Sequence, residues 1–441
     1  MYAFDAKLEA HATLKERFVW TLFMGALFFI LYGAANQYAH MTAPHFSFYG
    51  EWERQIPFVS PFIIPYMSSD VMFCIAFLLP QTRLELRTLS LRVLFIVVSS
   101  VLIFVFFPLQ CAFTKPQVDS YRFLFNLLLA DLPYNQLPSL HISFAVVLWA
   151  SMREHFVNRL VKYGVALWFW LIALSTLLVY QHHFIDLPTG FLMGLCAIGL
   201  IPSRKNNPLL NRFMTPRSLK VGLYYLSGAL VFLVGAFYAH SLFLLWIFVS
   251  LLLVSIVYAF GFNELIAGKN AQASWWQWVL FAPYFIGTHL SWRWYKRTLP
   301  LFAQVQERVY VGRHPDTKEY ARLKEVGVKH IVNLALEHQC RQRFISQTRF
   351  AFLDLTIPST EVLHEVVLLI EKYKEEGIYV HCALGLSRSI LAIGAWLMYQ
   401  GYSLEQIHER LRHIRPAYVT SKYMHVCLSL YATYLEEQKR S

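Results

Sequence analysis

The first two thirds of the chain alternate long apolar runs with short basic loops. An apolar run of about 17–20 residues is long enough to cross a bilayer as a helix. The pattern therefore predicts a polytopic membrane protein. The run at 140–153 is shorter than this and needs flanking residues to span the bilayer. The predicted helices lie near residues 18–36, 58–80, 93–110, 140–153, 160–180, 184–202, 221–239 and 242–260, with a marginal ninth at 276–292.

Basic residues orient these helices. Lys and Arg concentrate in alternate loops, which the positive-inside rule assigns to the cytoplasm, and residues 111–139 and 181–186 then face the other side. The ninth run decides the side of the remaining chain: if it spans, the chain ends outside, and if it lies along the interface, the chain ends inside. The tryptophans at 275–278 predict an interfacial anchor, and the cations Arg293, Lys296 and Arg297 favour the inside.

Composition agrees with a membrane protein. Apolar residues make up 56% of the chain and charged residues 15%, whereas a soluble domain is about 45–50% apolar and about a quarter charged. The basic residues behind the net charge of +12 fall in loops between apolar runs. We therefore interpret this charge as a signal of membrane topology and expect no nucleic-acid partner. The six cysteines have no spacing typical of disulfides or zinc, and we expect no metal or cofactor.

From about residue 303 the pattern becomes that of a soluble α/β domain. VYVG (310–313), HIVNLA (330–335), FAFLDL and IYVHC predict strands. YARLKEVG and LHEVVLLIEKYKEEG predict helices between them, and two further helices follow the last strand.

The segment IYVHCALGLSRS places Cys382 at a strand end, five residues before Arg388 and Ser389. A helix N-terminus and a nearby guanidinium favour the thiolate form of a cysteine. Loop N–H groups around Gly385 can cradle an anion, and Arg388 offers a planar fork for two phosphate oxygens. Ser389 can donate a hydrogen bond to the sulfur when it leaves. This pattern predicts a phosphate-transfer site.

Residues 303–435, with VYVGRHP, KEVGVKHIVNLALE and HCALGLSRS, resemble the dual-specificity branch of the protein tyrosine phosphatases. The resemblance implies that Cys382 is the nucleophile and that Arg388 binds phosphate. Asp354 in LDLTIPS matches the family's mobile acid loop and is the preferred general acid, and Glu361 is a second candidate. Phosphoproteins and membrane phosphomonoesters both remain as substrates, although tethering to a bilayer favours lipids.

Polar residues also gather on the presumed outer face of the apolar region, where lipid would not tolerate them unpaired. His182 and Asp186 are four residues apart, so the carboxylate can orient the imidazole. Two histidines, a carboxylate and two cations form a reasonable phosphoryl-transfer set. These residues are Lys115, Arg122, His141, His182 and Asp186, and Ser139 lies with His141 at the start of the fourth predicted helix. Asp70, inside an apolar run, is interpreted as a helix–helix contact.

Residues 60–200 resemble the membrane-bound type 2 phosphatidic acid phosphatases. The resemblance implies that His182 attacks phosphorus, Asp186 orients it and His141 protonates the leaving group, while Lys115, Arg122 and Ser139 hold phosphate. Three family positions differ, with Phe123 for Pro, Leu140 for Gly and Thr176 for Arg. Pro-Ser-Leu-His is similar to the inositol phosphorylceramide synthase branch, so a head-group transferase and a non-catalytic lipid-binding anchor remain as alternatives to a hydrolase.

The predicted architecture is thus an all-α membrane bundle, with a six-helix phosphatidic acid phosphatase type 2-like core and two or three extra helices, followed by an α/β dual-specificity phosphatase domain. The expected parts are a cytoplasmic N-terminus (1–17), the membrane domain (18–202), additional helices and linker (203–300) and the phosphatase domain (301–441). The whole chain resembles bacterial inner-membrane fusions of these two phosphatase types, which implies a multi-pass inner-membrane protein with a cytoplasmic phosphatase domain.

Overall fold

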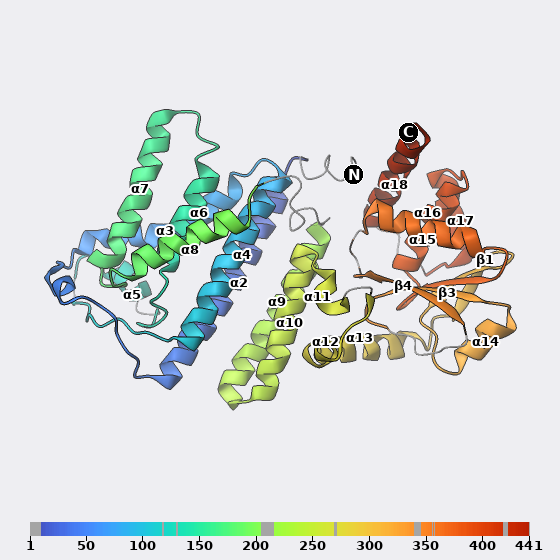
Figure 1. Cartoon of the computed structure of the whole chain (residues 1–441), viewed down its shortest axis with the longest axis horizontal. Coiled ribbons are helices and arrows are strands. Elements are labelled where there is room, and N and C mark those ends of the chain that lie inside the picture. The colour runs from blue at the N-terminus through green and yellow to red at the C-terminus, as the bar shows by residue number, and fades with distance from the viewer. Residues whose placement is uncertain are drawn as a thin grey trace. The chain divides into compact units, whose positions relative to one another are not determined.

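The computed structural model describes residues 10–116, 119–128, 131–203, 216–268, 271–338, 345–354, 356, 358–417 and 422–440. The predicted N-terminal segment up to residue 9 and most of the basic loop after residue 203 lie outside these ranges. The chain divides into two compact units, Met1–Asn211 and Arg212–Ser441 (Figure 1). The second unit contains the helices predicted for 203–300 as well as the sheet domain.

The first unit is helical throughout its named elements. Helix α2 begins with a capping box, in which the Thr13 hydroxyl accepts from the Glu16 N–H while the Glu16 carboxylate accepts from the Thr13 N–H. The main helices are α2 (Leu14–Thr42), α3 (Ile63–Leu78), α4 (Arg83–Phe106), α5 (Arg122–Leu128), α6 (Leu140–Met152), α7 (Arg159–Leu178) and α8 (Asp186–Leu200).

Six helices of the described ranges are long and apolar enough to cross a membrane, namely α2, α3 with its preceding turn, α4, α7, α9 and α10. Helices α6 and α8 have 13 and 15 residues and are shorter than the predicted runs at 140–153 and 184–202. The two short helices pack closely, because a Cβ at Gly190 would lie 2.5 Å from the Ser139 carbonyl oxygen. This close approach carries the polar residues of α6 next to those of α8.

The second unit starts with a helical hairpin, α9 (Pro216–Ala239) and α10 (Leu242–Phe260), followed by α11 (Asn263–Ala267). The marginal ninth run does not form one helix. It breaks at Phe281 into α12 (Trp275–Leu280) and α13 (Ala282–Tyr295). Pro283 lies in the first turn of α13, where its missing N–H costs nothing, but it cannot continue an earlier helix.

A five-stranded sheet in the order β1-β2-β5-β3-β4 forms the rest of the second unit, with only β1 antiparallel to its neighbour among these strands. The strands are β1 (Phe302–Gln306), β2 (Val309–Arg313), β3 (His330–Ala335), β4 (Ser346–Phe352) and β5 (Ile378–Cys382). The helices are α14 (Glu319–Glu325), α15 (Thr360–Tyr373), α16 (Arg388–Tyr399), α17 (Leu404–Ile414) and α18 (Lys422–Arg440).

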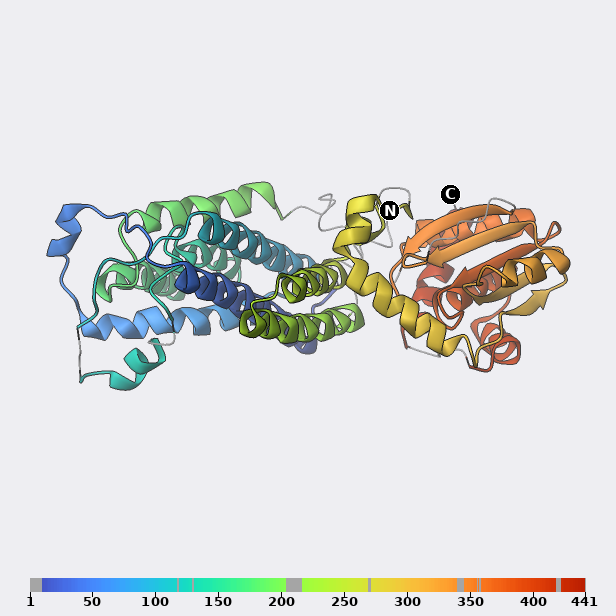
Figure 2. The same cartoon turned by 90° about the horizontal axis from the view of Figure 1, so that it is seen from below.

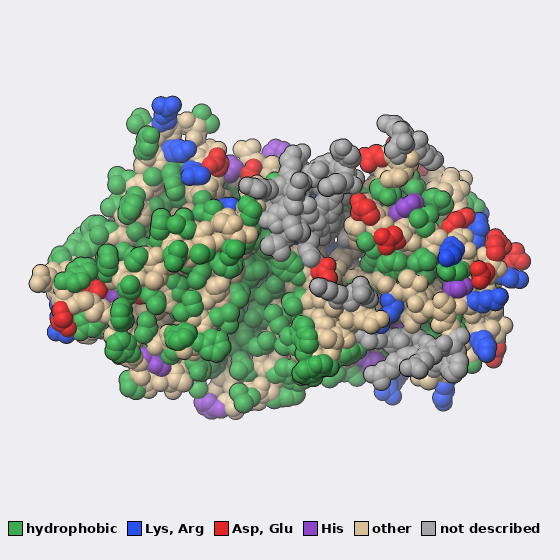
Figure 3. Space-filling model, viewed as in Figure 1, with side chains coloured by type: hydrophobic (Ala, Val, Ile, Leu, Met, Phe, Trp, Pro, Cys, Tyr) green, Lys and Arg blue, Asp and Glu red, His purple; other side chains and the backbone are tan. Residues whose placement is uncertain are grey.

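Helices cover both faces of this sheet (Figures 1 and 2). Residues of α15, α16, α17 and α18 share one core with Val309, Val332 and Val380, while α14 packs on the other face against Tyr310 and Tyr379. On the face drawn in Figure 3, most Lys, Arg, Asp and Glu side chains lie over the sheet domain with its helices, whereas apolar side chains dominate the helical part of the chain.

The predicted strands at 330–335 and 378–382 are confirmed. One strand and one helix were missed: β1 was not predicted, and three helices follow β5 where two were predicted.

Candidate active sites

The loop between β5 and α16 carries the predicted nucleophile. Cys382 is the last residue of β5 and Arg388 the first of α16, so residues 383–387 turn the chain from the sheet into the helix. Gly385 has φ of +69°, and a Cβ there would lie 2.4 Å from the Gly312 carbonyl carbon on β2. Only glycine fits both the conformation and the space.

Cys382 is buried at the centre of this loop. Its sulfur accepts a hydrogen bond from the Gly385 N–H at 3.3 Å and lies 3.4 Å from the Ser389 hydroxyl oxygen. The loop is also held from behind, since the buried Arg415 donates to the Leu384 carbonyl at 3.2 Å. The loop thus places two hydrogen-bonding groups on the sulfur.

Arg388 is fully buried and held by carboxylates. Its guanidinium forms a two-point ion pair with Glu337, at 2.9 and 2.5 Å, and donates to the Phe352 carbonyl at 2.8 Å. Burial disfavours the charged form of both side chains, but the charge of the partner outweighs this effect. The pKa of Glu337 is therefore lowered and that of Arg388 is raised. Glu337 fixes the fork in place. It was not singled out from the sequence, although a carboxylate after the apolar strand HIVNLA was the available signal.

Asp354 lies next to Arg388. Its carboxylate is 3.4 Å from Arg388 Nε, and its side chain is 44% exposed, so it can meet a substrate that enters from solvent. Glu361, the second acid candidate, lies in the first turn of α15.

A row of buried imidazoles lies behind the loop. The His381 ring is 5.3 Å from His314, which stacks on His338 at 4.8 Å between ring centroids. Burial lowers the pKa of His381 to about 3 and that of His338 to about 4, so these rings are neutral. They form an uncharged wall beside Glu337.

The first unit brings four of the six predicted polar residues together. His182 Nδ1 is 3.1 Å from the Asp186 carboxylate, and the same carboxylate accepts from the His183 N–H at 3.0 Å. The His141 ring lies 5.9 Å from His182, and the Ser139 N–H donates to the Asp186 carbonyl at 3.1 Å.

A cavity of about 500 Å³ opens on this cluster. His141 and His182 line it, together with Tyr32, Tyr66, Asp70 and Asp131. The helix–helix interpretation of Asp70 was therefore wrong, since this exposed carboxylate faces the cavity.

The two predicted cations are not among the lining residues of the cavity. Lys115 is half-buried, and the charge of Asp131 partly offsets the lowering of its pKa by burial. Arg122 is exposed at the start of α5. Asp131, which no sequence pattern indicated, accepts hydrogen bonds from Tyr32 and Asn36 at 2.9 and 2.8 Å.

Comparisons with known proteins agree with the geometry of the second unit. Residues 309–433 match the family described as dual specificity phosphatase, catalytic domain. Protein-tyrosine-phosphatase MKP1 of Arabidopsis thaliana is 30% identical over 122 residues, which are 26% of this chain and 15% of that protein. The chain thus spans a small part of this curated relative.

Two solved structures are also similar to part of the chain. Tk-PTP in its active form is 27% identical, covering 30% of this chain and 97% of that one with a TM-score of 0.28. PTPMT1 in complex with PI(5)P is 21% identical, covering 32% and 99% with a TM-score of 0.30. By its matched family, the C-terminal domain is a phosphatase of the protein tyrosine/dual-specificity type.

Proposed function

We propose that the chain is a membrane-anchored phosphatase whose C-terminal domain hydrolyses phosphomonoesters through Cys382. The observation that carries this proposal is the Cys382 loop, with its sulfur facing Gly385 and Ser389 and its Arg388 fork fixed by Glu337. The Cys382 thiolate attacks phosphorus and forms an S–P bond while the P–O bond to the leaving group breaks. Asp354, as the acid, gives its proton to the leaving oxygen.

Water completes the cycle. Asp354, now a carboxylate, takes a proton from water as the water oxygen attacks the phosphocysteine, and the S–P bond breaks to return the thiolate and release phosphate. Arg388 and the loop N–H groups stabilise the charge on the phosphoryl oxygens in both steps. Ser389 donates to the departing sulfur.

The test uses the full chain and an aryl phosphate. Cys382→Ser abolishes turnover, because the hydroxyl is a far weaker nucleophile than the thiolate. Asp354→Asn lowers the rate by a factor of about 10²–10⁴, because the amide cannot give a proton to the leaving oxygen. Unchanged turnover in Cys382→Ser would refute the nucleophile, and an unchanged rate in Asp354→Asn would move the acid role to Glu361.

For the first unit we propose hydrolysis of lipid phosphates or diphosphates at the outer leaflet by a type 2 phosphatidic acid phosphatase-like site. The cavity shared by His141 and His182 supports this proposal. His182, oriented by Asp186, attacks phosphorus and forms a P–N bond while the P–O bond to the leaving group breaks, and His141 protonates the leaving oxygen. Water then attacks the phosphohistidine, and the P–N bond breaks to release phosphate and return His182. The family resemblance assigns phosphate binding to Ser139, Lys115 and Arg122, of which the two cations lie outside the lining of this cavity.

The alternatives for this unit are a lipid head-group transferase and a non-catalytic anchor. Full-length protein carrying Cys382→Ser isolates the site, and a lipid with labelled phosphate distinguishes the outcomes. Free labelled phosphate supports hydrolysis, and label in a new lipid supports transfer. If neither forms, and His182→Ala has no effect in cells, the unit is an anchor.

A further inference from the structure

Helix α13 presents an uncovered apolar face. Ile286, Leu290 and Trp294 follow one another at intervals of four residues and are 57%, 60% and 69% exposed, so they form one stripe along the helix. Such a stripe is costly in water but favourable at a bilayer surface, where Trp is typical. The exposed cations Arg293 and Arg297 stand beside it and suit anionic lipid head groups.

The stripe is continuous with a membrane segment. Helix α13 packs on α10, which has the length and hydropathy of a membrane span, and both belong to the second unit. Tyr284 of α13 packs with Tyr225 of α9 and Tyr258 of α10. With 14 residues, α13 reaches about 21 Å at 1.5 Å per residue and is shorter than the bilayer core. The occupant that fits the stripe is therefore the bilayer surface beside the hairpin.

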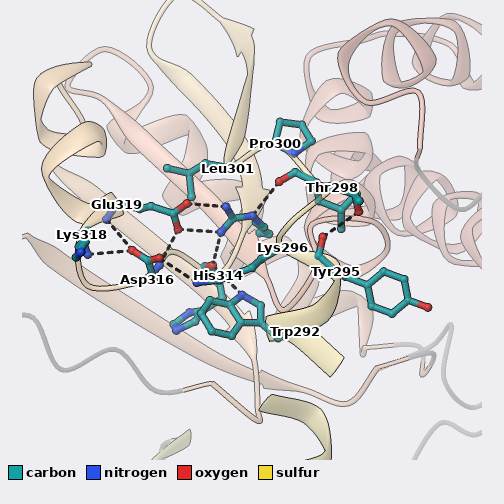
Figure 4. A network of polar contacts seen from close by, with 12 residues as sticks. Trp292, Tyr295, Lys296, Thr298, Pro300, Leu301, His314, Asp316, Lys318 and Glu319 are labelled. Carbon is teal, nitrogen blue, oxygen red and sulfur yellow. Dashed lines mark hydrogen bonds and ion pairs between the residues drawn. The ribbon is translucent and has the colours of Figure 1, made fainter. Parts of the chain in front are cut away.

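The opposite side of α13 is fixed to the phosphatase domain (Figure 4). The Trp292 indole N–H donates to the His314 carbonyl at 3.0 Å, and Lys296 forms an ion pair with Asp316 at 3.1 Å. Beyond the helix, Arg313 of β2 donates to the Leu299 carbonyl at 3.1 Å while it pairs with Glu319. These bonds leave the domain little freedom to turn away from α13.

The same helices reach the catalytic residues. Tyr258 of α10 and Phe281 and Phe285 share a core with Leu336 and Leu353, the immediate neighbours of Glu337 and Asp354. Burial, and then the charges of Tyr258 and Glu337, raise the pKa of Tyr284. The hairpin end and α13 thus pack against the strand ends that carry the Arg388 partner and the candidate acid.

We infer that the Cys382 site takes its substrate from the membrane: its substrate class is a lipid whose head group ends in a phosphomonoester. This inference rests on the proposed hydrolysis by Cys382 and adds the substrate class. A site fixed beside an interfacial helix meets head groups at the high local concentration of a surface.

The test uses full-length protein with His182→Ala, which leaves Cys382 as the catalytic nucleophile. Phosphatidylcholine vesicles carry phosphatidic acid, phosphatidylglycerophosphate or a phosphatidylinositol monophosphate, each separately, and a phosphotyrosine peptide and an aryl phosphate are assayed in parallel. We expect at least one lipid to be turned over faster than the peptide, at a rate set by its mole fraction in the vesicle rather than by its bulk concentration. If the aryl phosphate is hydrolysed but no lipid is turned over faster than the peptide, the inference about the substrate class is overturned and the proposed function stands. No turnover of the aryl phosphate would refute the proposed function itself.

A charged substitution in the stripe tests the docking surface. Leu290→Glu lowers the ratio of lipid to aryl-phosphate turnover about tenfold, because a carboxylate opposes insertion beside anionic lipid. The matched control is Leu368→Glu on α15, which is also exposed, at 44%, but outside the stripe, and it leaves the ratio unchanged. The ratio is taken within each protein preparation, so partial loss of folded protein cancels. An equal ratio in both variants would contradict the docking surface.

Discussion

The Cys382 site combines residues that are neighbours in the sequence with a carboxylate from a distant strand end. Cys382, Gly385, Arg388 and Ser389 lie within eight consecutive residues, and the structure keeps them together in one loop. Glu337 is 51 residues from Arg388, so only the pairing of β3 with β5 brings it near. In the first unit the spacing of His182 and Asp186 predicted their contact, whereas Asp131 reaches the cavity through a loop that no periodicity describes.

Removal of the Glu337 charge tests the buried ion pair. Glu337→Gln keeps the size of the side chain but leaves Arg388 with a weaker set of partners, so the free energy of unfolding falls by about 3–5 kcal/mol. Because the freed guanidinium still binds oxyanions, vanadate raises the melting temperature of the variant more than that of the unsubstituted chain. Thermal unfolding with and without vanadate measures both effects.

The matched control for this prediction is Glu376→Gln. Glu376 pairs with His330 at 3.3 Å, but its side chain is 53% exposed, and an exposed pair contributes about 0–1 kcal/mol. Equal destabilisation by the two substitutions would show that Glu337 does not hold Arg388.

The buried imidazoles predict an acid-sensitive domain. Burial lowers the pKa of His338 from 6.5 to about 4 and lowers that of His314 well below 6.5. Below pH 6.5 the unfolded chain binds protons that the folded domain does not, so stability falls as the pH falls from 6.5 towards 4. Each such histidine contributes a slope of about 1.4 kcal/mol per pH unit.

Melting temperatures measured across this pH range check the acid sensitivity. His338→Phe keeps a flat ring against His314 and removes one titrating group, so its stability falls less steeply with acid. The same slope in this variant and in the unsubstituted chain would contradict the prediction.

At the scale of elements, the sequence predicted the buried strands well and the edges poorly. HIVNLA and IYVHC are mostly apolar strands in the middle of the sheet, whereas FAQVQ of β1 is a half-polar edge strand with no strong pattern. The run at 276–292 resembled one marginal span because its mean hydropathy does not register the helix break at Pro283. Pro283 instead lies in the first turn of α13. The short length of α6 agrees with the short run at 140–153, whereas α8 begins at Asp186 and ends at Leu200, inside the predicted run at 184–202.

The contact between α6 and α8 gives a prediction for that pair of helices. Gly190→Ala forces a methyl group to within 2.5 Å of the Ser139 carbonyl oxygen, and overpacking of this kind costs about 1–3 kcal/mol. Gly199 lies on the same helix, and a Cβ there would have no atom within 4 Å, so Gly199→Ala is neutral or slightly stabilising. Thermal unfolding of the two purified variants in detergent compares them directly. A Gly190→Ala protein as stable as Gly199→Ala would show that the helices do not approach this closely.

At the scale of the whole molecule, the side of the membrane on which the phosphatase domain lies follows from helix lengths. The basic loop before α9 is predicted to be cytoplasmic. Helices α9 and α10 are long enough to cross and return, whereas α12 and α13, with 6 and 14 residues, are too short to cross again. We therefore expect the chain to end on the side of the basic loop.

Two reporter fusions test this topology. Green fluorescent protein, which folds in the cytoplasm, fluoresces when fused after Ser441, and a periplasmic alkaline phosphatase fused there is inactive. The matched pair is fused after His240, in the turn between α9 and α10, and there we expect the reverse: an active alkaline phosphatase and no fluorescence. Because the two positions differ only by α10 and the parts that follow it, opposite results mean that α10 crosses and α12–α13 does not. An active alkaline phosphatase at both positions would mean that the chain crosses once more before the sheet domain, and the catalytic cysteine would then face the oxidising side, where a reactive thiol is poorly preserved.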